Sequence, residues 1–227
     1  MAKKRLEKND YIEPPRLPEE ASAGILPENH LYELDSYQNI WVSNCKLTGA
    51  KGVTLNQAYF QNVQISDAHF PRFDISNTRF DKCDFANTEF EKASLNRVEF
   101  IGCRILGFKV LKSHIKDTLI KDCHGKFAQF ESTKFRSVRF ENCTLEDSDF
   151  QSADLSNVVF VNCNMRNVIL SGAKLAGTDF RGSSIENLQV SLEQLREAIF
   201  EPMQAVYLLQ RYTGVIVKHK ENEPSST

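Results

Sequence analysis

The amino-acid sequence predicts an all-β solenoid whose chain winds in square coils, each made of four five-residue repeats. Three observations lead to this fold class. From Leu55 to Val190, every fifth residue is large and apolar, with Gly125 as the one exception. Two positions before each large residue stands a second, usually small, residue. Five of the six cysteines recur once in every four repeats.

The five-residue period excludes the common secondary structures. An amphipathic helix repeats at 3.6 residues and a half-buried strand at 2. A backbone that turns a corner every five residues fits, because the large and the small residue then point inward and three mostly polar residues point outward. Four corners close one coil, and successive coils stack at the strand spacing of ~4.8 Å. The chain is therefore expected to form about seven to eight coils with a small C-terminal helical cap.

The cysteine column has two interpretations. Its members are Cys83, Cys103, Cys123, Cys143 and Cys163. They could form a metal or redox ladder, or they could be small buried core residues, which is common for free cysteine. No histidine or carboxylate shares the column, and residues stacked at ~4.8 Å do not surround a metal tetrahedrally. The sequence therefore favours core residues, and no metal or cofactor is expected.

The repeat motif, exemplified by Ala153-Asp154-Leu155-Ser156-Asn157, resembles that of the pentapeptide-repeat family. The resemblance covers residues 53–190, in one register. It implies a right-handed quadrilateral β-helix that acts through its surface rather than by catalysis.

The flanking segments lack the period. Residues 1–30 contain four prolines among charged residues and are predicted to be an extended or disordered arm. Residues 31–52 are expected to form an N-terminal cap and a partial coil, with Ile40 and Trp41 closing the open end of the core. Gly125 breaks the repeat. Phe127 or Phe108 could fill the space beside it, or a bulge could redirect His124.

Residues 191–217 are predicted to be a helical cap and dimerisation element. Ser191 and Gln194 make a capping box for a first helix. Pro202 opens a second helix, Gly214 ends it, and residues 215–217 would form a short strand. Residues 218–227 would be a disordered tail.

The cap carries more apolar residues than a lid over one coil needs, which predicts a self-association surface. The proposed dimerisation residues are Met203, Val206, Tyr207, Leu209, Val215, Ile216 and Val217. This C-terminal end is also similar to the quinolone-resistance branch of the family. That similarity implies a homodimer of rods paired at their C-termini and shaped and charged like a DNA duplex.

The charges give a mixed picture. There are 28 Lys and Arg against 30 Asp and Glu, so bulk charge indicates no direct nucleic-acid binding. One coil carries acidic residues and no base, an "acidic belt" offered as the partner-binding site: Glu141, Glu146, Asp147, Asp149 and Asp154. A "basic face" is expected to gather side chains from three coils that could hold an acidic partner or phosphate: Arg97, His114, Lys116, Lys134 and Arg136.

Two functions follow from these features. No phosphate-binding loop, paired zinc motif or catalytic triad is found, so the chain is not expected to be an enzyme. It has no apolar run of membrane-spanning length and no signal peptide, which predicts a cytoplasmic protein without a membrane partner. The acidic belt and the dimer end favour a DNA mimic that modulates DNA gyrase or topoisomerase IV. The neutral surface and the basic face favour a structural or adaptor rod for another protein.

Overall fold

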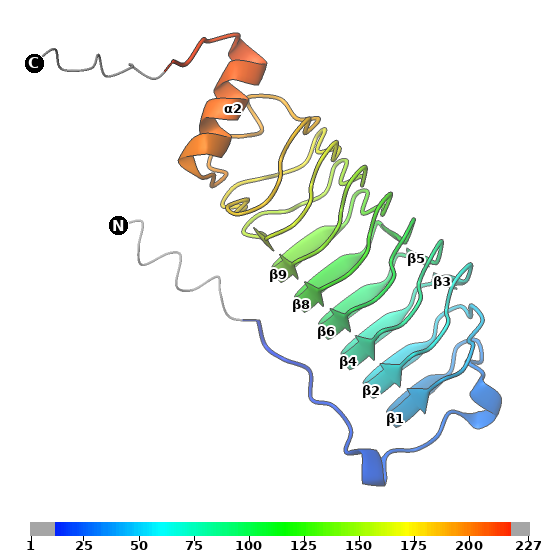
Figure 1. Ribbon diagram of the computed structural model, residues 1–227. Helices are drawn as coiled ribbons and strands as arrows, with labels where there is room; N and C mark the ends of the chain where they lie inside the picture. The colour runs from blue at the N-terminus through cyan, green and yellow to red at the C-terminus, as the bar shows by residue number, and fades with distance from the viewer. Residues whose placement is uncertain (1–11, 219–227) are drawn as a thin grey trace, which may run out of the picture.

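A computed structural model describes residues 12–218, which form a right-handed β-solenoid with one α-helix at its C-terminal end (Figure 1). Six eight-residue strands and the three-residue β10 form one wall: β1 (Ser36–Ser43), β2 (Thr54–Gln61), β4 (Asp74–Asp81), β6 (Ser94–Ile101), β8 (His114–Lys121), β9 (Lys134–Glu141) and β10 (Val159–Val161). A second wall contains β3 (His69–Pro71), β5 (Glu89–Glu91) and β7 (Lys109–Leu111). The remaining elements are η1 (Glu20–Ser22), η2 (Pro27–Asn29) and α2 (Pro202–Thr213).

All the strands pair in parallel, and in the repeat each residue is opposite its counterpart four repeats later. Leu55 pairs with Ile75, which pairs with Leu95. The strands account for about six turns, somewhat fewer than the seven to eight coils predicted. Isolated bridges continue the spacing as far as Asp179 and Ile199. The last coils therefore pair through isolated bridges rather than through continuous strands.

A left-handed backbone conformation produces the corners. The residues at every fifth position from Gln57 to Asn167 have positive φ. Asn and Asp tolerate this conformation better than most residues, which explains why they recur after the large inward residue. Their side chains also form ladders between coils, since Asn142 Nδ2 donates to Asp122 Oδ1 at 2.8 Å.

The core is a filled channel with two aromatic stacks. Phe60, Phe80 and Phe100 stack with ring centroids 5.0 and 5.1 Å apart. A second stack continues the same column, with successive centroids 5.0–5.5 Å apart: Phe140, Phe160, Phe180 and Phe200. Ile120 separates the two stacks and is itself buried. Aromatic pairs at these distances add to the free energy of burial.

The cysteine column lies inside the rod, where all five thiols are buried and free. The Cys103 thiol contacts the carbonyl oxygen of Phe80 at 3.4 Å, and the Cys143 thiol contacts that of Ile120 at 3.3 Å. The neighbouring Cys123 thiol and burial raise the pKa of the Cys143 thiol above its ordinary value. The column has the environment of core packing.

The corner at Gly125 is an ordinary one. Its carbonyl accepts the Ala128 amide at 3.1 Å, as at other corners. A Cβ on Gly125 would lie 3.0 Å from Ile105 and 3.2 Å from Leu145, so side chains of the adjacent coils already fill the space. The expectation that Phe127 folds inward is wrong, because Phe127 is 51% exposed.

The N-terminal end is closed by segments that the period could not predict. Gly24 bridges to Ile40 and covers part of the edge of β1. Leu26 and Leu31 are buried with Ile40, whereas Trp41 packs on Tyr59 with ring centroids 4.1 Å apart. Residues 1–11 of the predicted arm lie outside the described residues.

The C-terminal end differs from the prediction in two respects. Residues 191–199 are turns rather than a helix, because Leu195 and Phe200 extend the five-residue period. The capping contacts of Ser191 and Gln194 are present, and the Gln194 side chain also donates to the carbonyls of Leu170 and Ala173 at 2.8 and 3.0 Å. The second helix is confirmed as α2, followed by Gly214 at φ 72°. Residues 215–217 are not in a strand, and residues 219–227 of the predicted tail lie outside the described residues.

Candidate protein-binding surfaces

Helix α2 is held against the last coil by polar contacts around one buried leucine. Leu208 is buried. The Tyr212 hydroxyl donates to the Leu188 carbonyl at 2.5 Å, and the Tyr207 hydroxyl accepts the Asn187 amide at 2.9 Å. The Gln204 side chain donates to the carbonyls of Phe180 and Ser183, both at 2.8 Å. These contacts fix the helix on the end of the rod.

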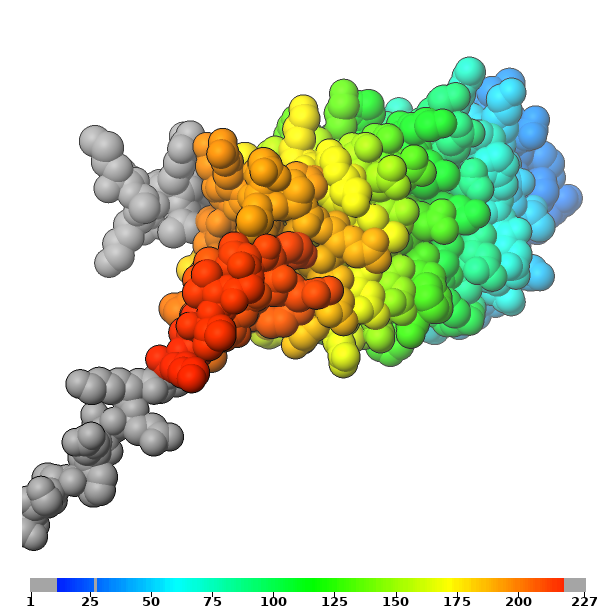
Figure 2. All heavy atoms as spheres, turned by 90° about the horizontal axis from the view of Figure 1, so that it is seen from above, coloured from blue at the N-terminus to red at the C-terminus, as the bar shows by residue number. Residues whose placement is uncertain are grey.

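The other side of this end is apolar and open to solvent. Ile216 is 78% exposed and Met203 70%. Leu209, Val215 and Val217 are also exposed, as is Leu192. Val206 and Tyr207 are partly buried, so of the seven predicted dimerisation residues five form this "exposed end". Figure 2 shows the orange and red C-terminal residues gathered at one end of the rod.

The acidic belt surrounds the rod instead of forming one patch. Glu141 ends β9, and the other four side chains follow around the coil. Glu141 and Glu146 directly follow an inward residue, Asp149 and Asp154 directly precede one, and only Asp147 has the positive φ of a corner, so the five side chains are spread over successive walls. A partner on one side would therefore contact only part of it.

Most of the belt is paired with bases of the preceding coils. Lys121 Nζ lies 3.3 Å from Glu141 Oε2. Lys126 Nζ lies 3.7 Å from a Glu146 oxygen and 3.2 Å from an Asp147 oxygen. The excess negative charge visible along the sequence is thus largely balanced in space.

The remaining belt residues have their own partners. Asp149 accepts the amide of Gln151 at 2.7 Å, and Arg136 contacts Asp154 at 3.0 Å. Partial burial raises the pKa of Asp154, but the Arg136 guanidinium and Ser156 outweigh it and hold the pKa at about 2. The Asn167 amide and Lys126 lower the pKa of Asp147. Both carboxylates are therefore ionised at neutral pH.

The basic face exists and receives the N-terminal arm. Register places His114 opposite Lys134 and Lys116 opposite Arg136. Arg97 donates to Asn77 at 2.8 Å and lies 3.7 Å from Glu13 of the arm. The backbone amide of Arg16 also donates to Asn77, at 3.4 Å. The non-periodic arm gave no sequence signal for this contact.

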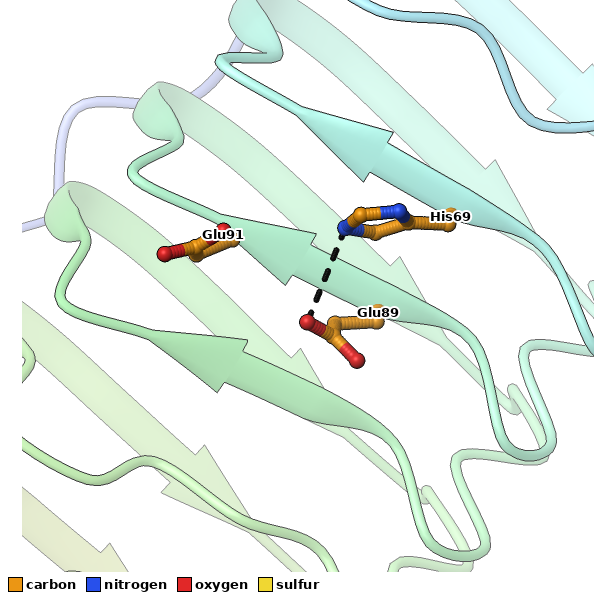
Figure 3. Close-up of side chains that lie close together, drawn as sticks. All are labelled: His69, Glu89 and Glu91. Carbon is orange, nitrogen blue, oxygen red and sulfur yellow. Dashed lines mark ion pairs between the residues drawn. The ribbon is translucent and has the colours of Figure 1, made fainter.

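One cluster of possible metal ligands was missed in the sequence. His69, Glu89 and Glu91 each offer a donor atom, and these atoms lie within 4.8 Å of one another (Figure 3). His69 and Glu89 are one coil apart along the chain, so the coil length was the signal that could have revealed the pair. Among the described residues it is the only such group of three found.

A shallow surface depression is lined by a cysteine and a histidine, but the two do not form a nucleophile and base pair. Cys103 and His124 both line it. Cys103 is buried, however, with its thiol directed to the Phe80 carbonyl inside the rod. A catalytic nucleophile needs a base within hydrogen-bond reach and must be accessible to the substrate. The buried Cys103 thiol is not accessible to a substrate.

Comparison with known proteins identifies the repeat. The family described as "Pentapeptide repeat region" matches residues 53–130, 73–145 and 133–208. A search of curated proteins found no match. Across residues 12–218, no helix has both the length and the apolar character needed to cross a membrane.

Solved structures with the same repeat are distant in sequence. A trypsin-treated form of QnrB1, a plasmid-mediated fluoroquinolone resistance protein, is 19% identical, with 81% of this chain and 100% of that chain covered and a TM-score of 0.39. A second trypsin-treated form is 16% identical, covering 87% and 100%, with a TM-score of 0.44.

HetL, a pentapeptide repeat protein involved in heterocyst differentiation regulation in the cyanobacterium Nostoc sp. strain PCC 7120, is 16% identical, covering 69% of this chain and 87% of that chain, with a TM-score of 0.25. The family match spans most of the rod and agrees with its five-residue corners and square coils. The chain belongs to the pentapeptide repeat family.

Proposed function

We propose that this protein is a non-catalytic rod that pairs with a second copy through its exposed end and binds a type II topoisomerase, DNA gyrase or topoisomerase IV, in place of DNA. The observation that supports this proposal most directly is the exposed end itself. Five large apolar side chains, from Met203 to Val217, are 40–78% exposed on helix α2, which is fixed to the rod, and on the segment that follows it. Apolar surface gathered in this way is typical of an interaction site.

Symmetry links the exposed end to the topoisomerase. Pairing two rods through the same surface gives a two-fold axis, so each acidic belt would be repeated at equal distance from the junction. A type II topoisomerase binds and cuts duplex DNA, and we expect it to present paired basic grooves to which two acidic belts could bind. The belt carboxylates keep part of their surface, with exposures of 22% for Glu141 and 30% for Glu146.

A second function is favoured by the ion pairs of the belt. Lys121, Lys126 and Arg136 form ion pairs with four of its five carboxylates, Lys126 being shared by two of them. A rod whose charges are balanced in this way matches a structural or adaptor protein for another partner. In that case the basic face, around Lys116 and Lys134, is the next surface to probe.

The deciding experiment adds the purified protein to a DNA gyrase supercoiling assay, with and without a fluoroquinolone, and measures binding to gyrase and topoisomerase IV in parallel. The topoisomerase proposal expects saturable binding and a change in supercoiling or in drug sensitivity. The direction of the change distinguishes inhibition from protection. Absence of binding to both enzymes would leave the adaptor function.

Charge reversal distinguishes a specific role of the acidic belt in binding from the effect of the protein's net charge. Changing Glu146, Asp147 and Asp149 to Lys should slow association and flatten its dependence on salt, because exposed charges are screened within ~10 Å at 0.1 M salt. A matched variant reverses three exposed acids nearer the N-terminus: Asp35, Asp67 and Asp74. Equal effects of the two variants would contradict a specific role for the belt.

The exposed end is tested by its own variant. Ile216→Asp should convert a dimer to a monomer in analytical ultracentrifugation and leave the thermal unfolding transition in place, since Ile216 contributes little to the core. Leu192→Asp, on a nearby turn outside the proposed set, is the control. A parent protein that sediments as a monomer at all concentrations would refute the pairing. Topoisomerase binding that survives in the monomer would separate the two parts of the proposal.

A further inference from the structure

The most complete group of metal-ligating side chains lies on the second wall, far from the exposed end. Register places His69 of β3 opposite Glu89 of β5. Glu91 is two residues further along β5, on the same outward side, because Phe90 between them is buried. Paired parallel strands thus fix the backbone positions of all three residues.

The side chains are already close to a metal-binding arrangement. His69 Nε2 lies 3.6 Å from Glu89 Oε1 (Figure 3). This separation exceeds a normal hydrogen bond. Two ligands of a tetrahedral ion with bonds of ~2.1 Å are separated by roughly 3.4 Å. The pair therefore needs little movement to hold one ion between its donor atoms.

The third donor can join without strain. All three donor atoms lie within 4.8 Å of one another. Glu91 also lies 3.5 Å from Lys92 Nζ, and the Lys92 side chain is 59% exposed. That lysine can move into water when a divalent ion takes its place beside the carboxylate. The Glu91 side chain is 32% exposed and lies on the outward side of β5.

From this geometry we propose that His69, Glu89 and Glu91 bind one Zn²⁺ ion, with water completing its coordination. A histidine nitrogen with two carboxylate oxygens is a donor set that zinc accepts. Magnesium and calcium prefer all-oxygen sites. Because the ligands come from two successive coils, the ion cross-links β3 to β5 on the wall whose strands are only three residues long.

The test titrates Zn²⁺ alone into the tag-free protein of 227 residues by isothermal calorimetry. The expected result is one saturable site per chain. His69→Ala and Glu89→Gln should each weaken zinc binding by about tenfold or more, since even groups that only orient a metal ligand are worth that much. Zinc should also raise the unfolding temperature of the parent and leave that of His69→Ala unchanged.

Two controls make the result specific. His114→Ala changes the other histidine that begins a strand, opposite Lys134 rather than a carboxylate, and should bind zinc like the parent. Co²⁺ substituted for zinc should give a visible spectrum without a sulfur-to-cobalt charge-transfer band, which excludes the thiols. A parent without a saturable site, equal binding by His69→Ala, or a thiolate spectrum would each overturn the proposal.

Discussion

The interior of the rod and its exposed end are made of the same kinds of side chain but differ in what covers them. Phe80 and Phe160 are enclosed by the coils before and after them and are at most 1% exposed. Met203 and Ile216, at the end, have no following coil and are 70% and 78% exposed. In a solenoid each repeat is stabilised by its neighbours. At this end α2 takes the place of a following coil, and among the described residues nothing covers the outer side of α2 in turn.

The largest expected difference between the interior and the surface of the rod is in the reaction rate of the cysteine thiols. With a thiol reagent under native conditions, the five buried cysteines should react about 10³-fold or more slowly than in unfolded protein, because access requires opening of a structure stable by ~5 kcal/mol or more. Cys45 is only partly buried and should react first. Rapid native labelling of several cysteines would place the column outside the core.

Truncating one ring tests how strongly the interior depends on its neighbours. Phe100→Ala removes a buried ring that contacts Phe80, Phe85 and Phe108, and should lower the free energy of unfolding by about 3–5 kcal/mol. Met203→Ala at the exposed end should change it by less than about 0.5 kcal/mol. Urea unfolding of the two variants measures both. Similar losses would remove the distinction between the two regions.

A smaller effect is expected at Gly125, where sequence and structure give opposite predictions. Leucine would restore the five-residue motif, and from the motif alone it should stabilise the rod. In the structure Ile105 and Leu145 occupy the space, so Gly125→Leu should cost about 1–3 kcal/mol through overpacking. Thermal unfolding decides between them, with Ser152→Ala at another corner as a control. A higher unfolding temperature would favour the motif.

The smallest effect concerns the ion pair of Asp154 with Arg136. The folded pKa of Asp154, about 2, lies below the ordinary value of ~3.9. The pair therefore contributes stability above about pH 4 and loses it as pH falls towards 2. Arg136 is 56% exposed, so screening keeps the contribution below about 1 kcal/mol. Asp154→Asn and Arg136→Gln should both flatten the pH dependence of unfolding in this range. An unchanged slope in either would contradict the assignment.

The sequence predicted the parts of the molecule that follow the repeat. The large apolar residues at every fifth position from Leu55 predicted the core, and asparagines such as Asn142 and Asn162 indicated the corners. Both kinds of residue recur with a fixed period. The belt was harder, since charges counted along the chain hid pairs such as Glu141 with Lys121, which lie in successive coils. Residues 191–199 were predicted to be a helix from their capping residues and apolar spacing, and the stacking of Phe200 on Phe180 shows that the coil continues there instead. The arm has no period, so its contact with Arg97 depends on tertiary structure alone.

Because the chain turns a corner every five residues, insertions and deletions of whole repeats fall into two kinds with different consequences. Loss or gain of four whole repeats shortens or lengthens the rod by one coil and leaves every outer column aligned. Loss of a single repeat keeps the inward positions filled by residues of the right class, but every later wall is then turned by one side of the square. The exposed end would face a new direction relative to His69 and the basic face. Evolution of such a chain can therefore alter the relative orientation of its surfaces in discrete steps without rebuilding its interior.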